Sequence, residues 1–255
     1  MEVEYSREGE VARIHLNRPE RLNAVTVGLT DQLGAALARA SAEGARVVVL
    51  AGRGRAFCAG HDLKEPEPVE TPVQTRLRLE AIQEVTRLIR RFPGPVVAAV
   101  HGYALGAGCE FALACDLVVA GEDAQFGFPE VGVGLSVTGG ISRLLPMLVG
   151  WAKAKELLLL GERVTGAEAA RIGLVARAVP AGEHEAVALE LAQRFVARPP
   201  LALSLAKQVL DHGLDATLEE AMVREVDHAI LTSLSGEGEA PKEACLLYTS
   251  DAADE

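Results

Sequence analysis

Two glutamates lie among apolar residues, where a charged side chain is unusual. Glu110 opens the stretch EFALA, and Glu130 opens the stretch EVGVG. Burial would disfavour the ionised form of both carboxyl groups and raise the pKa of each. Two such groups facing one carbonyl would make an acid/base pair. Either glutamate could equally cap a helix or pair with an arginine, and their spacing alone leaves the choice open.

Two glycine-rich loops could present backbone N–H groups to a ligand. Each follows an apolar run that predicts a buried strand, at 46–52 and at 96–100. The loops read AFCAGHDL (56–63) and HGYALGAGCE (101–110), with small residues just before an expected helix. Two converging N–H donors there would stabilise an oxyanion. On spacing alone, two ordinary strand-to-helix turns are the simpler interpretation, because glycine marks turns first.

Other sequence motifs of catalytic, nucleotide-binding and metal-binding sites are incomplete or absent. Val137 stands where a dinucleotide fingerprint beginning at Gly132 needs its third glycine, and Thr138 stands where a nucleophile elbow at Ser136 needs one. The sequence has no G-K-[ST] phosphate loop, and its histidines lack the H-x-x-x-H spacing of a metal site. Its four cysteines form no C-x-x-C pair, so we expect buried, reduced thiols.

Composition limits the partners. The chain of 255 residues has a formal charge of −11 and no basic run, which argues against nucleic acid and against an anionic membrane surface. Its longest apolar runs are too short to span a bilayer, and its first residues do not read as a signal sequence. We therefore expect a soluble, cytoplasmic protein.

Strands and helices that could position these groups alternate along the first part of the chain. Two N-terminal strands precede a helix capped by Thr26 and closed near Gly44, and a later helix has an apolar face from Leu77 to Phe92. After the strand at 96–100 come a helix through Phe111, a strand at 116–121 and a short strand at 124–128. Beyond residue 138 the pattern becomes mostly helical. Such alternation normally favours a doubly wound parallel sheet.

The chain divides into a core, a helical region and a short C-terminal tail. An αβ core over 1–200 is followed by a helical region over 201–244. The last residues, CLLYTSDAADE (245–255), resemble the translation of a transposase sequencing adapter, codon for codon. We therefore expect 245–255 to be a non-native tail that takes no part in the fold, with the natural chain cut near Ala244.

Three stretches carry a resemblance to a known family. NRPERLNA (17–24), AFCAGHDLKE (56–65) and AAVHGYALGAGCEFALACDLVVAGEDAQFGFPEVGVG (98–134) resemble the enoyl-CoA hydratase/isomerase, or crotonase-like, family. The similarity extends over residues 2–235. It implies an α/β fold other than the doubly wound sheet: a crotonase-like spiral of repeated β-β-α units with a C-terminal helical region. It also implies that 201–244 serves in trimerisation, and that the protein is a homotrimer or homohexamer.

The resemblance also implies roles for particular residues. His61 and Ala107 would donate the two backbone N–H groups of an oxyanion hole, and Glu110 and Glu130 would be the catalytic pair. The implied substrate-binding and CoA-binding residues are His61, Asp62, Leu63, Lys64 and Ala107. Asp62 could equally start a helix. The favoured reaction is hydration of a 2-enoyl-CoA thioester to a 3-hydroxyacyl-CoA in fatty acid metabolism, with no cofactor, because CoA is part of the substrate.

Two other functions stay open. An enoyl-CoA isomerase of this family would use mainly Glu130, whereas a non-catalytic acyl-CoA-binding protein would need neither glutamate. One departure from the family bears on the choice. GLSVTGGISRL (134–144) has Val137 and Thr138 in place of the Pro-Gly-rich turn of hydratases and is one residue shorter, which predicts a different water pocket. The implied loss of the family's C-terminal end predicts weaker affinity for CoA.

Overall fold

The structure is a computed structural model that describes residues 1–62, 64, 69–213 and 215–238. The chain divides into two compact units, Met1–Gln193 and a second that begins at Arg194, and each is described by itself. The first unit holds both glycine-rich loops and both candidate glutamates. Leu63 and the expected non-native tail at 245–255 lie outside the described residues.

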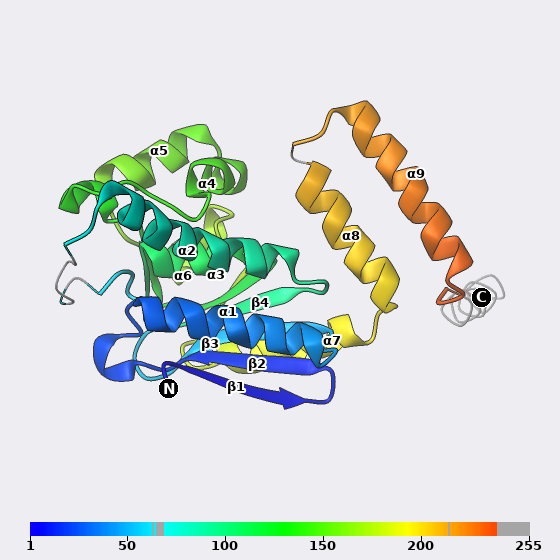
Figure 1. Cartoon of the computed structure of the whole chain (residues 1–255), viewed down its shortest axis with the longest axis horizontal. Helices are drawn as coiled ribbons and strands as arrows, with labels where there is room; N and C mark the ends of the chain where they lie inside the picture. Colours follow the sequence, from blue (N-terminus) through cyan, green and yellow to red (C-terminus); the bar gives the residue numbers. More distant parts are fainter. Residues whose placement is uncertain (63, 65–68, 214, 239–255) are drawn as a thin grey trace. The chain divides into compact units, whose positions relative to one another are not determined.

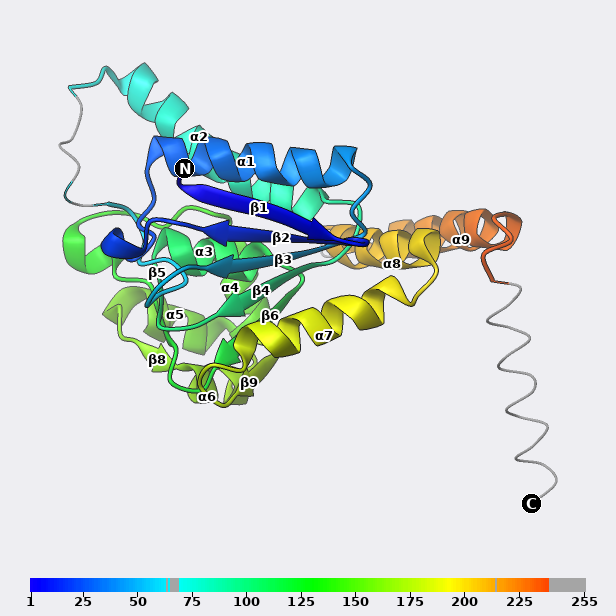
Figure 2. The same ribbon diagram turned by 90° about the horizontal axis from the view of Figure 1, so that it is seen from below.

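A six-stranded sheet runs through the first unit (Figure 2). Its strands lie in the order β1 (Val3–Glu8), β2 (Val11–Leu16), β3 (Val47–Gly52), β4 (Val96–Val100), β6 (Leu117–Gly121) and β9 (Arg177–Val179). β1 and β2 pair antiparallel, and each later pair is parallel. A second sheet joins β5 (Tyr103–Leu105), β7 (Gln125–Gly127) and β8 (Val164–Thr165). The strands expected at 46–52, 96–100, 116–121 and 124–128 are confirmed.

The central strands are apolar along their whole length because both faces of the sheet are covered. β3 and β4 are buried at every position, as their continuous apolar runs predict. Ile14 and Leu16 on β2 join the main core, whereas His15 between them faces the other way and contacts Glu185 at 3.0 Å, at the start of α7 (His184–Val196). Figures 1 and 2 show α1 (Val27–Ala42) and α2 (Pro72–Arg91) side by side over one face of the sheet.

The two long helices agree with the sequence in different measure. α1 begins as predicted, because the Thr26 hydroxyl accepts the backbone N–H of Leu29 at 3.0 Å. The predicted face of α2 is wrong at its start: Leu77 is 65% exposed, and burial begins at Ile82 and continues to Ile89. The first turns of α2 extend beyond the sheet (Figure 2), so an apolar residue there has no core to join within this chain.

Beyond residue 138 the mostly helical pattern is confirmed, with two short strands that the sequence did not reveal. The helices are α4 (Ile141–Val149), α5 (Trp151–Leu160), α6 (Gly166–Arg171) and α7. β8 and β9 interrupt them, and β9 adds the last strand to the large sheet. Strands of two or three residues are too short for alternation to be recognised.

The second unit is a pair of helices, α8 (Pro200–Gly213) and α9 (Leu218–Leu234), that pack against each other (Figure 1). Thr217 and Glu220 form a capping box at the start of α9. Leu218, Met222 and Val226 lie at helical spacing on α9 and form an apolar stripe that is exposed in the single chain, where Leu218 is 76% and Val226 60% exposed. Within the described ranges, no helix is both long and apolar enough to cross a membrane.

Candidate active site

The loops that leave β3 and β4 lie against each other. The N–H of Cys58 donates to the carbonyl of Tyr103 at 2.9 Å, and the N–H of Leu105 donates to the carbonyl of Cys58 at 3.0 Å. Parallel neighbouring strands end at the same edge of a sheet, so the loops that follow them meet there. Gly60 has a φ of +89°, and a Cβ on it would lie 2.8 Å from the carbonyl oxygen of Leu105. Glycine at position 60 therefore permits the close approach of the two loops.

The candidate oxyanion donors are the backbone N–H groups of His61 and Ala107. The N–H of Val25 donates to Gly60 at 2.8 Å and the N–H of Asp62 donates to Val25 at 3.2 Å, so both neighbours of His61 are tied down. Among the described residues, no hydrogen bond uses the N–H of His61 itself. Ala107 is the first residue of α3 (Ala107–Ala114), where an N–H has no partner within the helix and the helix dipole favours negative charge.

Glu110 lies one turn into α3 and is only 1% exposed. Both carboxylate oxygens accept a hydrogen bond from Thr138: the backbone N–H donates to Oε1 and the hydroxyl to Oε2, each at 2.7 Å. Burial raises the pKa of Glu110, and the two bonds from Thr138 oppose the rise because they stabilise the ionised form. The pKa nevertheless stays above its ordinary value, as the apolar neighbours of Glu110 predict.

Glu130 is the first residue of a short 3-10 helix, η2 (Glu130–Val133). Its Oε2 is buried and has no hydrogen-bond partner in the described part of the chain. Burial raises the pKa of Glu130, its own backbone N–H opposes the rise, and the nearby charge of Glu110 adds to it. A buried carboxyl oxygen without a donor favours the protonated form.

Glycine at position 106 lets the Glu130 side chain approach the two loops that carry the candidate donors. It has a φ of +51°, and a Cβ on it would lie 2.9 Å from Oε1 of Glu130 and 3.9 Å from Cα of Gly60. Its carbonyl accepts the N–H of Glu110 at 2.9 Å. Oε1 of Glu130 and the N–H of Ala107 therefore lie beside Gly106 and the loop that carries His61, and Glu110 is close enough to Glu130 for its charge to raise the pKa of Glu130. This arrangement could hold a carbonyl next to a proton donor and a proton acceptor.

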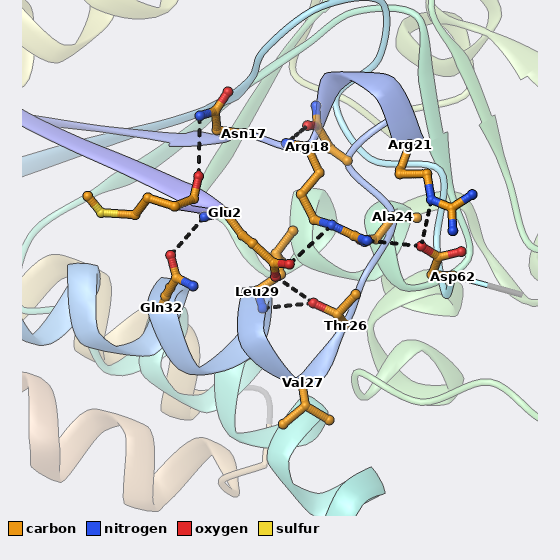
Figure 3. Close-up of polar contacts among 12 residues, drawn as sticks. Glu2, Asn17, Arg18, Arg21, Ala24, Thr26, Val27, Leu29, Gln32 and Asp62 are labelled. Atoms are coloured by element: carbon orange, nitrogen blue, oxygen red, sulfur yellow. Dashed lines mark hydrogen bonds and ion pairs between the residues drawn. The ribbon is translucent and has the colours of Figure 1, made fainter. Parts of the chain in front are cut away.

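Asp62 is held by protein partners. Its side chain is 5% exposed and contacts Arg18 Nη2 at 3.1 Å and Arg21 Nε at 3.5 Å (Figure 3). Its Oδ1 accepts the N–H of Lys64 at 3.1 Å, and neither Asp62 nor Lys64 is helical. Burial alone would raise the pKa of Asp62, but the N–H of Lys64 and the two arginines hold it below its ordinary value. Lys64 is exposed, and the predicted contact at Leu63 lies outside the described residues.

Arg18 is the centre of this network, a role that sequence reasoning missed. Its Nε contacts Glu2 Oε1 at 3.2 Å, and its Nη1 donates to the carbonyl of Ala24 at 2.6 Å (Figure 3). Glu2 also accepts the hydroxyl of Thr26 at 2.6 Å. One guanidinium therefore ties the N-terminus and the start of α1 to the loop that carries His61. The sequence did offer a signal for the pair, because Arg18 lies in the family-like stretch 17–24 and Asp62 lies in the family-like stretch 56–65.

The His61 ring is half-buried beside α2. Burial lowers the pKa of His61, and the positive charge of Arg78 lowers it further. The imidazole is therefore neutral near pH 7. Its side chain adds bulk but no fixed charge next to the two loops.

Comparison with known proteins identifies relatives over most of the chain. The family model for enoyl-CoA hydratase/isomerase matches residues 6–244. The 2,3-dehydroadipyl-CoA hydratase of Escherichia coli (strain K12) is 39% identical over 225 residues, which cover 88% of this chain and 87% of that protein. The short-chain-enoyl-CoA hydratase of Clostridium acetobutylicum is 34% identical over 221 residues, which cover 86% and 84% respectively.

Solved structures agree with these relatives. The crystal structure of an enoyl-CoA hydratase from Mycobacterium smegmatis matches with a TM-score of 0.91 and 31% identity, covering 97% of each chain. This likeness confirms the α/β crotonase-like fold with a helical C-terminal region and overturns the doubly wound sheet that strand-helix alternation favoured. Family model, sequence identity and fold together show that this chain belongs to the enoyl-CoA hydratase/isomerase family of enzymes.

Proposed function

We propose that the protein is an enoyl-CoA hydratase, which adds water across the 2,3 double bond of a 2-enoyl-CoA thioester to give a 3-hydroxyacyl-CoA. The observation that carries the proposal is the closeness of two buried carboxyl groups with raised pKa: Oε1 of Glu130 lies beside Gly106, next to the helix that carries Glu110, and the charge of Glu110 raises the pKa of Glu130. Relatives that are named hydratases support the same reaction. Hydration needs a proton acceptor and a proton donor around one water, and this site offers both.

In the proposed reaction, the thioester carbonyl accepts hydrogen bonds from the N–H groups of His61 and Ala107. Glu110 takes a proton from water as the water oxygen bonds to C3, and the electrons of the double bond move onto the carbonyl oxygen. As the carbonyl re-forms, Glu130 gives its proton to C2. Each oxyanion donor contributes about 10²–10³ in rate, and general acid/base help contributes about 10²–10⁴. The steps need no metal or redox cofactor.

The two roles follow from the surroundings of each carboxyl group. Thr138 donates to both oxygens of Glu110, which favours its ionised form as the acceptor. Oε2 of Glu130 has no donor among the described residues, which favours the protonated form. A pair of carboxyl groups whose surroundings push their protonation states apart is the arrangement that acid/base catalysis requires.

For CoA, we propose that residues 61–64 and Ala107 line the path of the thioester. The Asp62 carboxylate is bound by Arg18 and Arg21, so its contribution is to fix the loop. Lys64 is exposed and its ammonium is available to a phosphate of CoA.

For the assembly, we propose a homotrimer or homohexamer, which the exposed apolar stripe of α9 supports because such faces are normally covered.

Glutamine variants test the reaction. Glu110→Gln and Glu130→Gln keep the side-chain shape but remove the titrating group, and each should lower kcat about 10²–10⁴-fold with little change in KM. The double variant should lose much less than the product of the two, because the pair acts on one water. The assay follows loss of the enoyl-thioester absorbance.

Two outcomes would favour the other functions. If Glu110→Gln kept nearly full activity while Glu130→Gln abolished it, one base would suffice and double-bond isomerisation would be the reaction. If the purified protein bound acyl-CoA but turned over no enoyl-CoA thioester of a short, medium or aromatic series, it would be a non-catalytic binding protein.

A further inference from the structure

Thr138 donates two hydrogen bonds to the Glu110 carboxylate. It lies 28 positions further along the chain, in the shortened segment before α4, and reaches Oε1 with its N–H and Oε2 with its hydroxyl, each at 2.7 Å. The next residue, Gly139, has a φ of +60°, and a Cβ there would lie 2.7 Å from Cβ of Glu110. The backbone of this segment therefore rests directly on the Glu110 side chain.

These two hydrogen bonds fix the carboxylate of Glu110 but leave each of its oxygens able to accept a further hydrogen bond. Each carboxylate oxygen has two lone pairs, and Thr138 occupies one on each, so each oxygen can still accept a hydrogen bond from water. The hydroxyl of Thr138 can donate to an ionised Glu110 and can accept from a protonated one. The contact can therefore persist while Glu110 gains and loses a proton.

We propose that Thr138 is a positioning residue of this enzyme, which holds the Glu110 carboxylate in place through both oxygens and keeps it ready to accept the proton of the attacking water. The inference rests on the proposed hydration at this site. It assigns a role to the departure in segment 134–144, where a threonine side chain replaces part of the usual turn and supplies a donor.

The pH dependence follows from the groups around Glu110. Burial raises the pKa of Glu110, and the hydroxyl and N–H of Thr138 oppose the rise. In the described part of the chain, the titratable groups beside it are Glu130, on η2, and the buried thiol of Cys109, whose own pKa is raised so that it stays neutral. Removing the hydroxyl should therefore shift the titration of Glu110 to higher pH, with Glu130 as the neighbour whose charge couples to it.

The test compares Thr138→Val, which keeps the shape but removes the hydroxyl, with Thr138→Ser, which restores it. On the full chain with crotonyl-CoA as substrate, Thr138→Val should lower kcat about 10- to 100-fold, with KM within about threefold of wild type. The acid limb of its kcat–pH profile should move up by about one to two pH units. Thr138→Ser should return the limb and most of the rate.

Thr86→Val is the matched control. Thr86 is a buried threonine on α2 whose hydroxyl has no hydrogen-bond partner among the described residues, so its loss should leave the pH profile unchanged. An active wild type whose acid limb is unmoved in Thr138→Val, or a rate loss that serine does not restore, would overturn the role of Thr138 alone. A wild type that hydrates no enoyl-CoA would overturn the proposed function as well, and the two failures are thereby distinguished.

Discussion

Replacing Arg18 with methionine should destabilise the first unit, because one guanidinium holds three separate segments together. The change keeps much of the apolar stem but removes the contacts to Asp62 at 3.1 Å, to Glu2 at 3.2 Å and to the carbonyl of Ala24 at 2.6 Å. The Arg18 side chain is 12% exposed, so water replaces these contacts poorly. The carboxylate of Asp62 is most affected, because it is only 5% exposed and would lose one of its charged partners.

The magnitude follows from what remains around Asp62. Removing one partner of a buried ion pair costs about 3–5 kcal/mol. Arg21 at 3.5 Å and the N–H of Lys64 at 3.1 Å stay in place and offset part of that cost. Glu2 is 31% exposed and can turn to water. We therefore expect a loss of about 2–4 kcal/mol, which for a chain of this size lowers Tm by about 5–15 °C.

Urea unfolding and thermal melting would measure the loss. Arg53→Met is the matched control, because Arg53 pairs with Glu4 at 2.9 Å in an exposed setting, with side chains 45% and 43% exposed, where a pair is worth about 0–1 kcal/mol. In the background of Asp62→Asn, the loss from Arg18→Met should shrink, since the buried charge is gone. Equal losses for Arg18→Met and Arg53→Met would refute the reasoning.

Three further predictions concern the titrating carboxyl, a buried thiol and the assembly. The pKa of Glu130 is raised in the folded protein, so its contribution to stability is fully present below its unfolded pKa and is lost as pH rises through the folded pKa. Glu130→Gln should therefore raise Tm at pH 8 and change Tm little at pH 4. Equal Tm shifts at the two pH values would contradict this. Burial raises the pKa of Cys58 to about 12, so peptide mapping after iodoacetamide should find Cys58 alkylated only in unfolded protein, and rapid labelling of the native chain would show the thiol to be accessible. Light scattering should give the mass of a trimer or hexamer, and a monomer at micromolar concentration would count against the proposed role of α9.

The candidate site was predictable where chemistry is concentrated in short stretches. Glu110 and the glycines before it lie within ten residues, and buried strands before each loop predicted where the loops would meet. Glu130 was marked as a candidate by its apolar neighbours. These signals are local, so spacing and residue type picked out the positions as candidates but left helix caps and ordinary turns as alternatives, and the family resemblance supplied the roles.

The remaining features depend on contacts between distant parts of the chain. Thr138 and Glu110 meet because the segment before α4 folds back onto α3, and nothing in the sequence around Thr138 reports that approach. Between Arg18 and Asp62 lie a 3-10 helix (Pro19–Arg21), α1 and β3, and the two residues meet only because the loops after β2 and β3 lie at the same edge of the sheet. Leu77 reads as a core residue by periodicity, yet it is exposed, and burial on α2 begins only at Ile82.

The order of the strands in the two sheets has a consequence for synthesis. In each described sheet the strands lie in the same order as in the chain, so every new strand adds to an exposed edge. A chain that emerges from the ribosome N-terminus first can therefore extend the large sheet one strand at a time, from the β1–β2 hairpin outward. The outer edge of β6 stays unpaired until β9 pairs with it. A nascent chain released before Arg177 would expose that edge of β6, and an unpaired strand edge promotes aggregation.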